Sequence, residues 1–306
     1  LVKISEIVCR NLNNVIDRNL YPCTEAKRSS IRGRPIGIGV QGLADVFYKF
    51  KIPFESKQAK IINKKIFEAI YFGAMSMSTR LSRDIYIKQI NSEHNSESNH
   101  IPKTIGAYPA YLENKGSHLA NGKFMWELYG ITKENLSNMF DWDTLRSHIQ
   151  TFGVRNSLLT ALMPTASTSH INGNIECFEP ITSNMYKRKV LSGEFIIINK
   201  YLINDLTNMN LWNADIINYL KISGGSVQNI DGLSDEFKSI YKTAWEVSQK
   251  SIMGLSIDRQ PFIDQSQSLN IFFSTPTVGK LTTSHTLAWK LGLKTGQYYL
   301  RSESVE

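Results

Sequence analysis

A short apolar run, residues 157–163, stops at Pro164 and limits the folds open to this chain. Seven residues are too few for a buried helix, but they fit a strand that is covered on both faces. Longer segments with helical spacing of apolar residues stand before and after the run. Because buried strands that alternate with long helices are typical of α/β proteins, the sequence predicts an α/β fold with a buried strand at 157–163.

Three segments repeat apolar residues every three or four positions, which is the spacing of an amphipathic helix. The first is expected to bury a face made of Leu1, Ile4, Val8, Leu12, Val15 and Ile16. The second follows Ser56, the expected N-cap, and its apolar side consists of Ile62, Ile66, Ile70, Ala74, Met77 and Leu81. The third follows Ser234 and places on one face Phe237, Tyr241, Ala244, Val247 and Ser248.

Two segments between the helices are expected to be loops. The Pro- and Gly-rich stretch 33–39 predicts a loop with close approaches of the backbone. The polar stretch 91–100 has low complexity and predicts an exposed loop. Its two histidines, His94 and His100, have neither a scaffold nor cysteine partners nearby, so the sequence predicts no metal site there.

Composition excludes several classes of protein. The 306 residues are 42% hydrophobic and 20% charged, which excludes wholesale disorder, and no apolar run approaches the roughly 18 residues of a membrane span. A net charge of +8 suits anionic partners such as nucleotides, nucleic acid or an acidic protein surface. The longest dense basic run, residues 187–189, is short, so a nucleic-acid-binding module rests on charge alone.

The three cysteines, Cys9, Cys23 and Cys177, form no CxxC pair. Their spacing argues against a disulfide framework and a structural zinc site, and it favours a reducing intracellular compartment. Cys9 lies beside the apolar face of the first helix, where a buried and inert thiol is expected. Glu176 and Glu179 flank Cys177 and could act as acid or base, but a solvated or helix-terminal role is the favoured interpretation.

The segment after Pro164 consists of small and hydroxyl side chains, namely Thr165, Ala166, Ser167 and Thr168. At the start of a helix such a loop offers free backbone N–H groups and hydroxyl donors, which suit a phosphate. An ordinary Ser/Thr-rich N-cap without a ligand explains the same composition. Both interpretations stay open on the residues alone.

Two adjacent phenols, Tyr298 and Tyr299, stand in the last tenth of the chain. Neighbouring residues of a regular strand point to opposite faces, so the two rings can contact each other only where the backbone departs from strand geometry. Stacked phenols close to a redox centre can pass on an electron and a proton in steps. The alternative is a pair of β-favouring aromatics on an ordinary strand.

Several motifs taken together resemble the large subunit of class I ribonucleotide reductases. Residues 142–164 fit the pattern W-x2-L-x7-G-V-R-N-x3-T-A-x2-P, which is similar to the signature of that family. Further blocks that resemble the family, and most closely its eukaryotic members, are residues 34–45, 190–195, 264–270 and 293–301.

The resemblance implies a fold and a set of site residues. The fold would be a ten-stranded α/β barrel with long surrounding helices, of which residues 1–306 would be the C-terminal half, with an inserted polar loop at 91–104. A helix at 283–293 would form part of the groove for the tail of the small subunit. The residues implied to bind the diphosphate of a ribonucleoside diphosphate are Thr165, Ala166, Ser167 and Thr168. The residues implied to relay the radical are Tyr298 and Tyr299.

The resemblance also implies the partners of the intact protein. That protein would be a cytoplasmic, allosterically regulated and homodimeric oxidoreductase that supplies deoxyribonucleotides for DNA replication. Its partners would be the small subunit, whose metal centre generates the radical, and thioredoxin or glutaredoxin, with no membrane and no nucleic acid among them. No metal or cofactor is expected in this segment.

The resemblance further implies that this chain alone is inactive. In the family, the radical cysteine, the reducing cysteines and the ATP-binding and specificity sites lie outside the matched segment. The first helix of the chain also lacks a start signal, so a fragment is expected, and none of its three cysteines receives a role in turnover. A non-catalytic interaction or regulatory protein that binds the small subunit or a nucleotide is the alternative.

Overall fold

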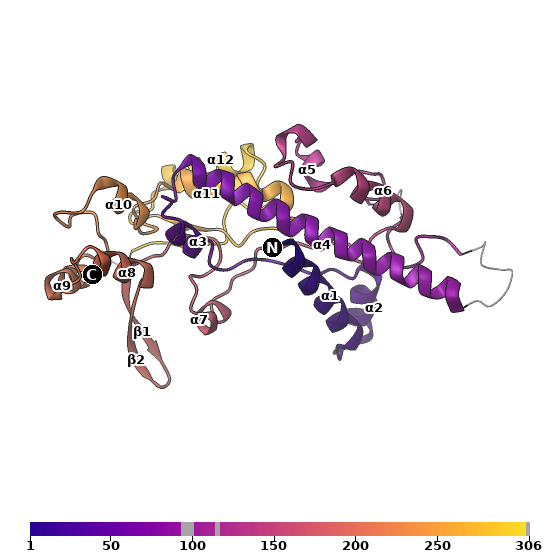
Figure 1. Cartoon of the computed structure of the whole chain (residues 1–306), viewed down its shortest axis with the longest axis horizontal. Helices are drawn as coiled ribbons and strands as arrows, with labels where there is room; N and C mark the ends of the chain where they lie inside the picture. The colour runs from indigo at the N-terminus through magenta and orange to yellow at the C-terminus, as the bar shows by residue number, and fades with distance from the viewer. Residues whose placement is uncertain (93–100, 114–116, 304–306) are drawn as a thin grey trace. The chain divides into compact units, whose positions relative to one another are not determined.

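The computed structural model describes residues 1–92, 101–113 and 117–303 (Figure 1). The chain divides into two compact units. The first unit comprises Leu1–Gly39, Asn63–Leu162 and Ile257–Gln267. The second comprises Val40–Ile62, Met163–Ser256 and Ser268–Glu306. Each unit is therefore assembled from segments that are far apart in the sequence.

Helices dominate the first unit. They are α1 (Val2–Arg18), α2 (Thr24–Gly33), most of α4 (Lys57–Ser92), α5 (Met125–Leu128), α6 (Trp142–Phe152) and the short 3₁₀ turns η3 (Lys133–Asn135) and η4 (Gln260–Phe262). The expected cap of α4 is confirmed, because the Ala59 N–H donates to Ser56 Oγ at 3.0 Å. Met77, on the predicted apolar side, is buried, as is its neighbour Met75.

The predicted strand at 157–163 is buried but is not a regular strand. It pairs in parallel on both sides through isolated bridges, Ile38 with Thr160 and Leu162 with Gln267. Asp264 explains the interruption, because its Oδ2 accepts the N–H groups of Leu159 (2.7 Å) and Thr160 (3.3 Å), which a continuous ladder would use. The stretch predicted as a loop at 33–39 thus ends in an extended segment that pairs with this run.

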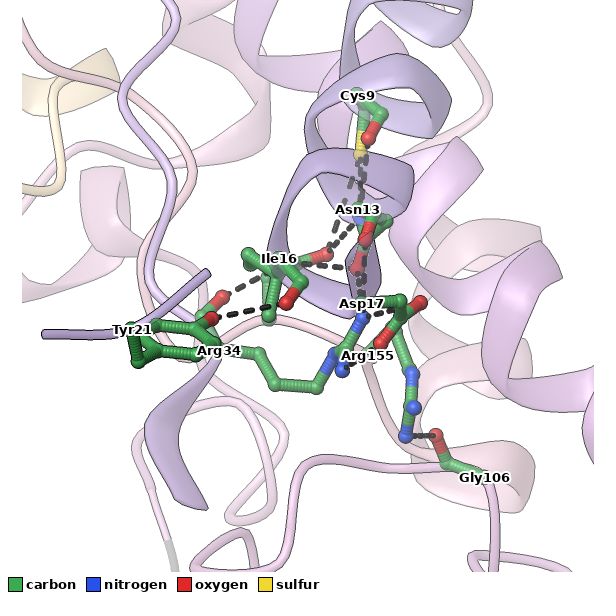
Figure 2. A network of polar contacts seen from close by, with 9 residues as sticks. Cys9, Asn13, Ile16, Asp17, Tyr21, Arg34, Gly106 and Arg155 are labelled. Carbon is green, nitrogen blue, oxygen red and sulfur yellow. Dashed lines mark hydrogen bonds and ion pairs between the residues drawn. The ribbon is translucent and has the colours of Figure 1, made fainter. Parts of the chain in front are cut away.

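The first helix is confirmed, but its predicted apolar face is buried only in part: Ile16 is buried, and Val8 and Leu12 are half-buried. The buried residues of α1 are Ser5, Cys9, Asn13 and Ile16, whereas Leu1, Ile4 and Val15 are each more than half exposed. A buried polar network decides the orientation of the helix (Figure 2). Asn13 Nδ2 donates to Asn156 Oδ1 at 2.9 Å, and Asn156 Nδ2 donates to the carbonyl oxygen of Arg34 at 2.8 Å. Buried amides need such partners, so their pairing outweighs the apolar pattern.

The second unit mixes helices with two short sheets. Its helices are α3 (Leu43–Lys49), α7 (Thr168–Asn172), α8 (Lys200–Asn208), α9 (Ala214–Ile222), α10 (Asp235–Ile240), most of α11 (Gln249–Arg259) and α12 (Val278–Lys290). β1 (Met185–Val190) and β2 (Gly193–Ile198) form an antiparallel hairpin, visible in Figure 1. β3 (Asn270–Phe272) and β4 (Tyr299–Arg301) pair in parallel, with Asn270 opposite Tyr299. The core contains Tyr48, Leu202, Leu206 and Tyr241.

The third predicted helix is wrong beyond its first turns. Ser234 caps α10 as expected, since its Oγ accepts the Phe237 N–H at 3.2 Å, but α10 ends at Ile240. After that point the backbone bonds elsewhere, because the Ala244 N–H donates to the Ile181 carbonyl oxygen at 2.7 Å. The ring of Tyr241 stacks on Tyr48 with centroids 5.3 Å apart. These long-range contacts replace the continuation of the helix.

The predicted α/β class is confirmed, and the bounds of two other predicted segments change. The helix expected at 283–293 is α12, which begins earlier and ends at Lys290. Of the polar loop predicted at 91–104, the first two residues belong to α4 and residues 93–100 lie outside the described part, as do the two histidines. In the described part of the chain, no helix has both the length and the hydropathy needed to span a bilayer.

Candidate functional site

The hydroxyl-rich loop follows the buried run and leads into α7, which begins at Thr168. Thr165 is half-buried, whereas Ala166, Ser167 and Thr168 are exposed. Within the described residues, the backbone N–H groups of these three exposed residues have no backbone acceptor. The Ser167 side chain makes no capping hydrogen bond to α7. The loop therefore has backbone donors without backbone acceptors, as an anion site needs.

Cys177 fixes the Thr165 side chain from the far side of the same loop. The Cys177 N–H donates to Thr165 Oγ1 at 2.8 Å, and the Thr165 hydroxyl lies 3.6 Å from Cys177 Sγ. The Cys177 thiol in turn donates to the carbonyl oxygen of Met163, 3.5 Å away. Burial raises the pKa of the Cys177 thiol, so the thiol stays protonated and can act as a donor.

A second contact holds the other end of the loop. The Thr168 hydroxyl donates to Gln41 Oε1 at 3.0 Å. Close to Gln41, the carboxylate of Asp45 accepts the N–H of Ile175 at 2.7 Å, and the Gly42 N–H donates to the Ile175 carbonyl oxygen at 2.9 Å. Gln41, Gly42 and the first turn of α3 thus support both the loop and the residues that precede Cys177.

The two phenols near the end of the chain contact each other. The ring centroids of Tyr298 and Tyr299 are 4.3 Å apart with an interplanar angle of 65°. β4 begins only at Tyr299, and Tyr298 lies before it, where its N–H donates to the Leu269 carbonyl oxygen at 2.6 Å. This start of the strand provides the departure from regular geometry that ring contact requires. The interpretation as two aromatics on one ordinary strand is therefore not supported.

Both phenols are open to solvent, and Tyr299 affects the pKa of Tyr298. Tyr298 is 46% exposed and Tyr299 50% exposed, so neither ring is core filler. The hydrogen bond with Tyr299 raises the pKa of Tyr298 above its ordinary value. The Arg301 guanidinium lies over the Tyr299 ring, 4.9 Å from its centroid, which is a cation–π distance.

A cavity of about 590 Å³ opens elsewhere in the second unit. Its lining includes His170, Lys200, Trp245 and Arg301. It includes neither Tyr298 nor Tyr299, and none of the four loop residues at 165–168. Two contacts lie within the lining: His170 Nε2 lies 3.2 Å from Glu176, and Lys200 Nζ lies 3.9 Å from Asp45. The residues that the sequence predicted for the site do not line this cavity.

The two carboxylates beside Cys177 differ in their surroundings. Glu176 is exposed, as expected, but Glu179 is only 6% exposed, so its predicted solvated role is wrong. Its carboxylate accepts the Asn270 N–H at 2.6 Å and Asn270 Nδ2 at 2.9 Å. Glu179 therefore anchors the first residue of β3, where the sequence carried no local sign of this role.

The remaining candidates are the three thiols and possible metal ligands. Cys9 is fully buried, as predicted, and burial raises the pKa of its thiol to about 12. Cys23 is exposed. Across residues 1–92, 101–113 and 117–303, no three His, Cys, Asp or Glu side chains are grouped as they would be around a metal ion. Sequence reasoning missed Gln41 and Cys177 as supports of the loop, since each acts on a residue more than ten positions away.

Comparison with known proteins gives concordant results. The family model "Ribonucleotide reductase, barrel domain" matches residues 1–299. The chain is 46% identical over 303 residues to a ribonucleoside-diphosphate reductase large subunit of Acanthamoeba polyphaga mimivirus, covering 99% of this chain and 32% of that protein. It is 45% identical over 305 residues to a ribonucleoside-diphosphate reductase large chain of Neurospora crassa, and the match covers 100% of this chain and 30% of that protein.

One solved structure shows the same fold at lower sequence identity. An Actinobacillus ureae class Id ribonucleotide reductase alpha subunit superposes with a TM-score of 0.69 at 24% identity. The superposition covers 98% of this chain and 46% of that one. The chain thus spans about a third of the length of the curated relatives described above.

Proposed function

The chain belongs to the ribonucleotide reductase barrel-domain family, and on that premise we propose that it is part of a large subunit that reduces ribonucleoside diphosphates to deoxyribonucleoside diphosphates. The reaction belongs to the longer protein, of which this segment is about a third by the measure of its relatives. Within it, this chain binds the substrate diphosphate and relays the radical. Alone, it is inactive.

The diphosphate binds at Thr165, Ala166, Ser167 and Thr168. The observation that carries this assignment is the set of exposed backbone N–H groups of Ala166, Ser167 and Thr168, which lack backbone acceptors among the described residues. Three such groups beside the three hydroxyls of Thr165, Ser167 and Thr168 can surround phosphate oxygens without a charged side chain. The net charge of +8 adds a favourable long-range field for an anionic substrate.

Tyr298 and Tyr299 form the radical relay. When a tyrosine passes on a radical, its phenol is reformed by gaining one electron and one proton, and the neighbouring phenol loses one of each. A centroid distance of 4.3 Å places the two phenols in contact, which favours such a joint transfer. Their half-exposed position leaves the pair accessible to a second protein that supplies the radical.

The remaining assignments follow from family membership. The fold of the intact domain is a ten-stranded α/β barrel, and the parallel bridges at Thr160 and Leu162 agree with barrel strands. The partner that supplies the radical, from its metal centre, is the small subunit. Its tail binds along α12, where Val278 (82%) and Trp289 (77%) are exposed apolar residues. The intact protein is a cytoplasmic homodimer that thioredoxin or glutaredoxin reduces.

Conservative variants of the intact large subunit test the relay and the loop separately. Tyr298→Phe and Tyr299→Phe remove an ionisable hydroxyl but little volume, so turnover should vanish while CDP binding stays within about twofold of wild type. Tyr219→Phe on α9 is the matched control and should keep full turnover. Ser167→Ala and Thr168→Val should weaken CDP binding. Full turnover by either relay variant would refute the radical assignment.

A further inference from the structure

We propose that Cys177 is a positioning residue for the diphosphate loop: it holds the Thr165 hydroxyl where a phosphate oxygen can receive its proton. This inference rests on the proposed function of the loop. Cys177 itself touches no substrate, and its role does not need a reactive thiol. Three independent observations support the role, namely the contacts of the residue, its backbone conformation and the weakness of sulfur as an acceptor.

The contacts of Cys177 close a small ring of polar groups around the loop entrance. Its N–H donates to Thr165 Oγ1 at 2.8 Å, and its thiol donates to the Met163 carbonyl oxygen at 3.5 Å. Cys177 therefore binds the residues on both sides of Pro164. Since Pro164 has no N–H of its own, the loop start has few other ways to be fixed by backbone bonds.

The backbone conformation of Cys177 indicates that this arrangement is imposed. Its φ is +47°, in the left-handed region that disfavours side chains other than glycine. Such a conformation persists only where the surroundings over-determine it. Here the surroundings are the Thr165 hydroxyl, the Met163 carbonyl and the Leu43 N–H, which donates to the Cys177 carbonyl oxygen at 3.5 Å.

The sulfur atom leaves the Thr165 proton easy to redirect. That hydroxyl donates to Cys177 Sγ, 3.6 Å away. A thiol sulfur is a weak acceptor, so the proton can turn toward a phosphate oxygen at little cost. Meanwhile the N–H of Cys177 keeps Oγ1 in place. The oxygen is held firmly and its proton loosely, which is the preorganisation that a binding group needs.

Three substitutions at Cys177 in the intact large subunit separate positioning from stability. Cys177→Ala removes the thiol and keeps the strained backbone, whereas Cys177→Gly removes the thiol and relieves the strain. Both variants lose the hydrogen bond from the thiol to the Met163 carbonyl oxygen, which holds the Cys177 backbone against the loop. They should therefore weaken CDP binding equally, by about 3- to 10-fold, while they differ in thermal midpoint. Cys177→Ser keeps a donor for Met163 but offers the Thr165 hydroxyl a stronger acceptor than sulfur, so it should bind CDP more weakly than wild type and more tightly than Cys177→Ala.

The other two cysteines supply the controls. Cys23→Ser changes an exposed thiol and should alter neither CDP affinity nor thermal midpoint. Cys9→Ala empties a fully buried position in the first unit and should lower the midpoint without changing CDP affinity. Equilibrium binding of CDP is the primary readout because it does not depend on the radical, and KM should rise in parallel while kcat changes less than twofold.

Specific outcomes would overturn the proposal. Wild-type CDP affinity in both Cys177→Ala and Cys177→Gly would do so, as would losses of affinity that follow the thermal midpoint from variant to variant. CDP binding that is no tighter in Cys177→Ser than in Cys177→Ala would also count against it. If Ser167→Ala and Thr168→Val weaken CDP binding while the Cys177 variants do not, the proposed function stands and only this inference fails.

Discussion

Replacing Asp17 by asparagine tests how much the buried Arg34 cation depends on its counter-charge. The Arg34 side chain is only 2% exposed, and its guanidinium nitrogens lie 2.6 and 3.0 Å from the two Asp17 carboxylate oxygens (Figure 2). The substituted side chain would keep one acceptor but present an amide N–H₂ group to the guanidinium, so a charge-assisted hydrogen bond would become a clash of donors. The neighbouring Arg155 cation would also lose a favourable charge.

The size of the effect follows from burial. Removing one partner of a fully buried ion pair costs about 3–5 kcal/mol. Asp17 is 52% exposed, so water compensates part of the loss, and we expect about 2–3 kcal/mol. This loss of stability should make α1 open more often, which hydrogen exchange of the intact protein, followed by mass spectrometry, measures as faster exchange of the α1 amides. The expected acceleration is roughly 30- to 150-fold for α1 amides.

The control is the same Asp→Asn substitution in an exposed ion pair. Lys133 and Asp143 interact on the surface, with 48% and 67% of their side chains exposed. Asp143→Asn should leave exchange in α6 nearly unchanged, because solvent already screens this pair. If α1 in the Asp17→Asn protein exchanges within threefold of wild type, or if the control shows an equal acceleration, the buried-charge reasoning is wrong.

Two further predictions concern pH and packing. Burial raises the pKa of Glu55, but hydrogen bonds from Lys242, the Ser248 N–H and Ser251 outweigh it and leave the pKa lowered. The stability that this carboxylate contributes should therefore be present above pH 4.5 and be lost as the pH falls through the folded-state pKa. Glu55→Gln should remove that component from acid unfolding curves. Gly106→Ala should destabilise by about 3 kcal/mol or more, because a Cβ would lie 2.0 Å from the Ser82 carbonyl oxygen. Gly279→Ala on α12, where nothing lies within 4 Å, is its control and should be neutral or stabilising in the same thermal assay.

The sequence predicted what depends on neighbours in the chain. Ser56 and Ser234 cap their helices as expected, because a cap bonds to a residue three positions away. The prediction failed where the partner is distant. α10 ends at Ile240 because Ala244 bonds to Ile181, and no local pattern near residue 244 announces that contact.

The apolar spacing in α1 misled for a related reason. Leu1, Ile4 and Val15 form a regular stripe, yet the helix buries Asn13 instead. Asn13 is buried because it shares hydrogen bonds with Asn156, 143 positions later, and leaving either amide unpaired inside the protein would cost more than exposing an apolar side chain. Hydrophobic periodicity measures only the apolar term, so it cannot detect such a pair.

The contact between the rings of Tyr298 and Tyr299 depends on distant residues, because adjacent residues of a regular strand point to opposite faces. Ring contact requires Tyr298 to lie outside β4, and the register of β3 with β4 decides this, since Asn270 pairs with Tyr299 and leaves Tyr298 opposite Leu269. Glu179 in turn holds Asn270 through two hydrogen bonds. Glu179, which the sequence predicted to be solvated, therefore holds Asn270, and Asn270 pairs with Tyr299 of the phenol pair. Its burial is explained by the strand that it anchors.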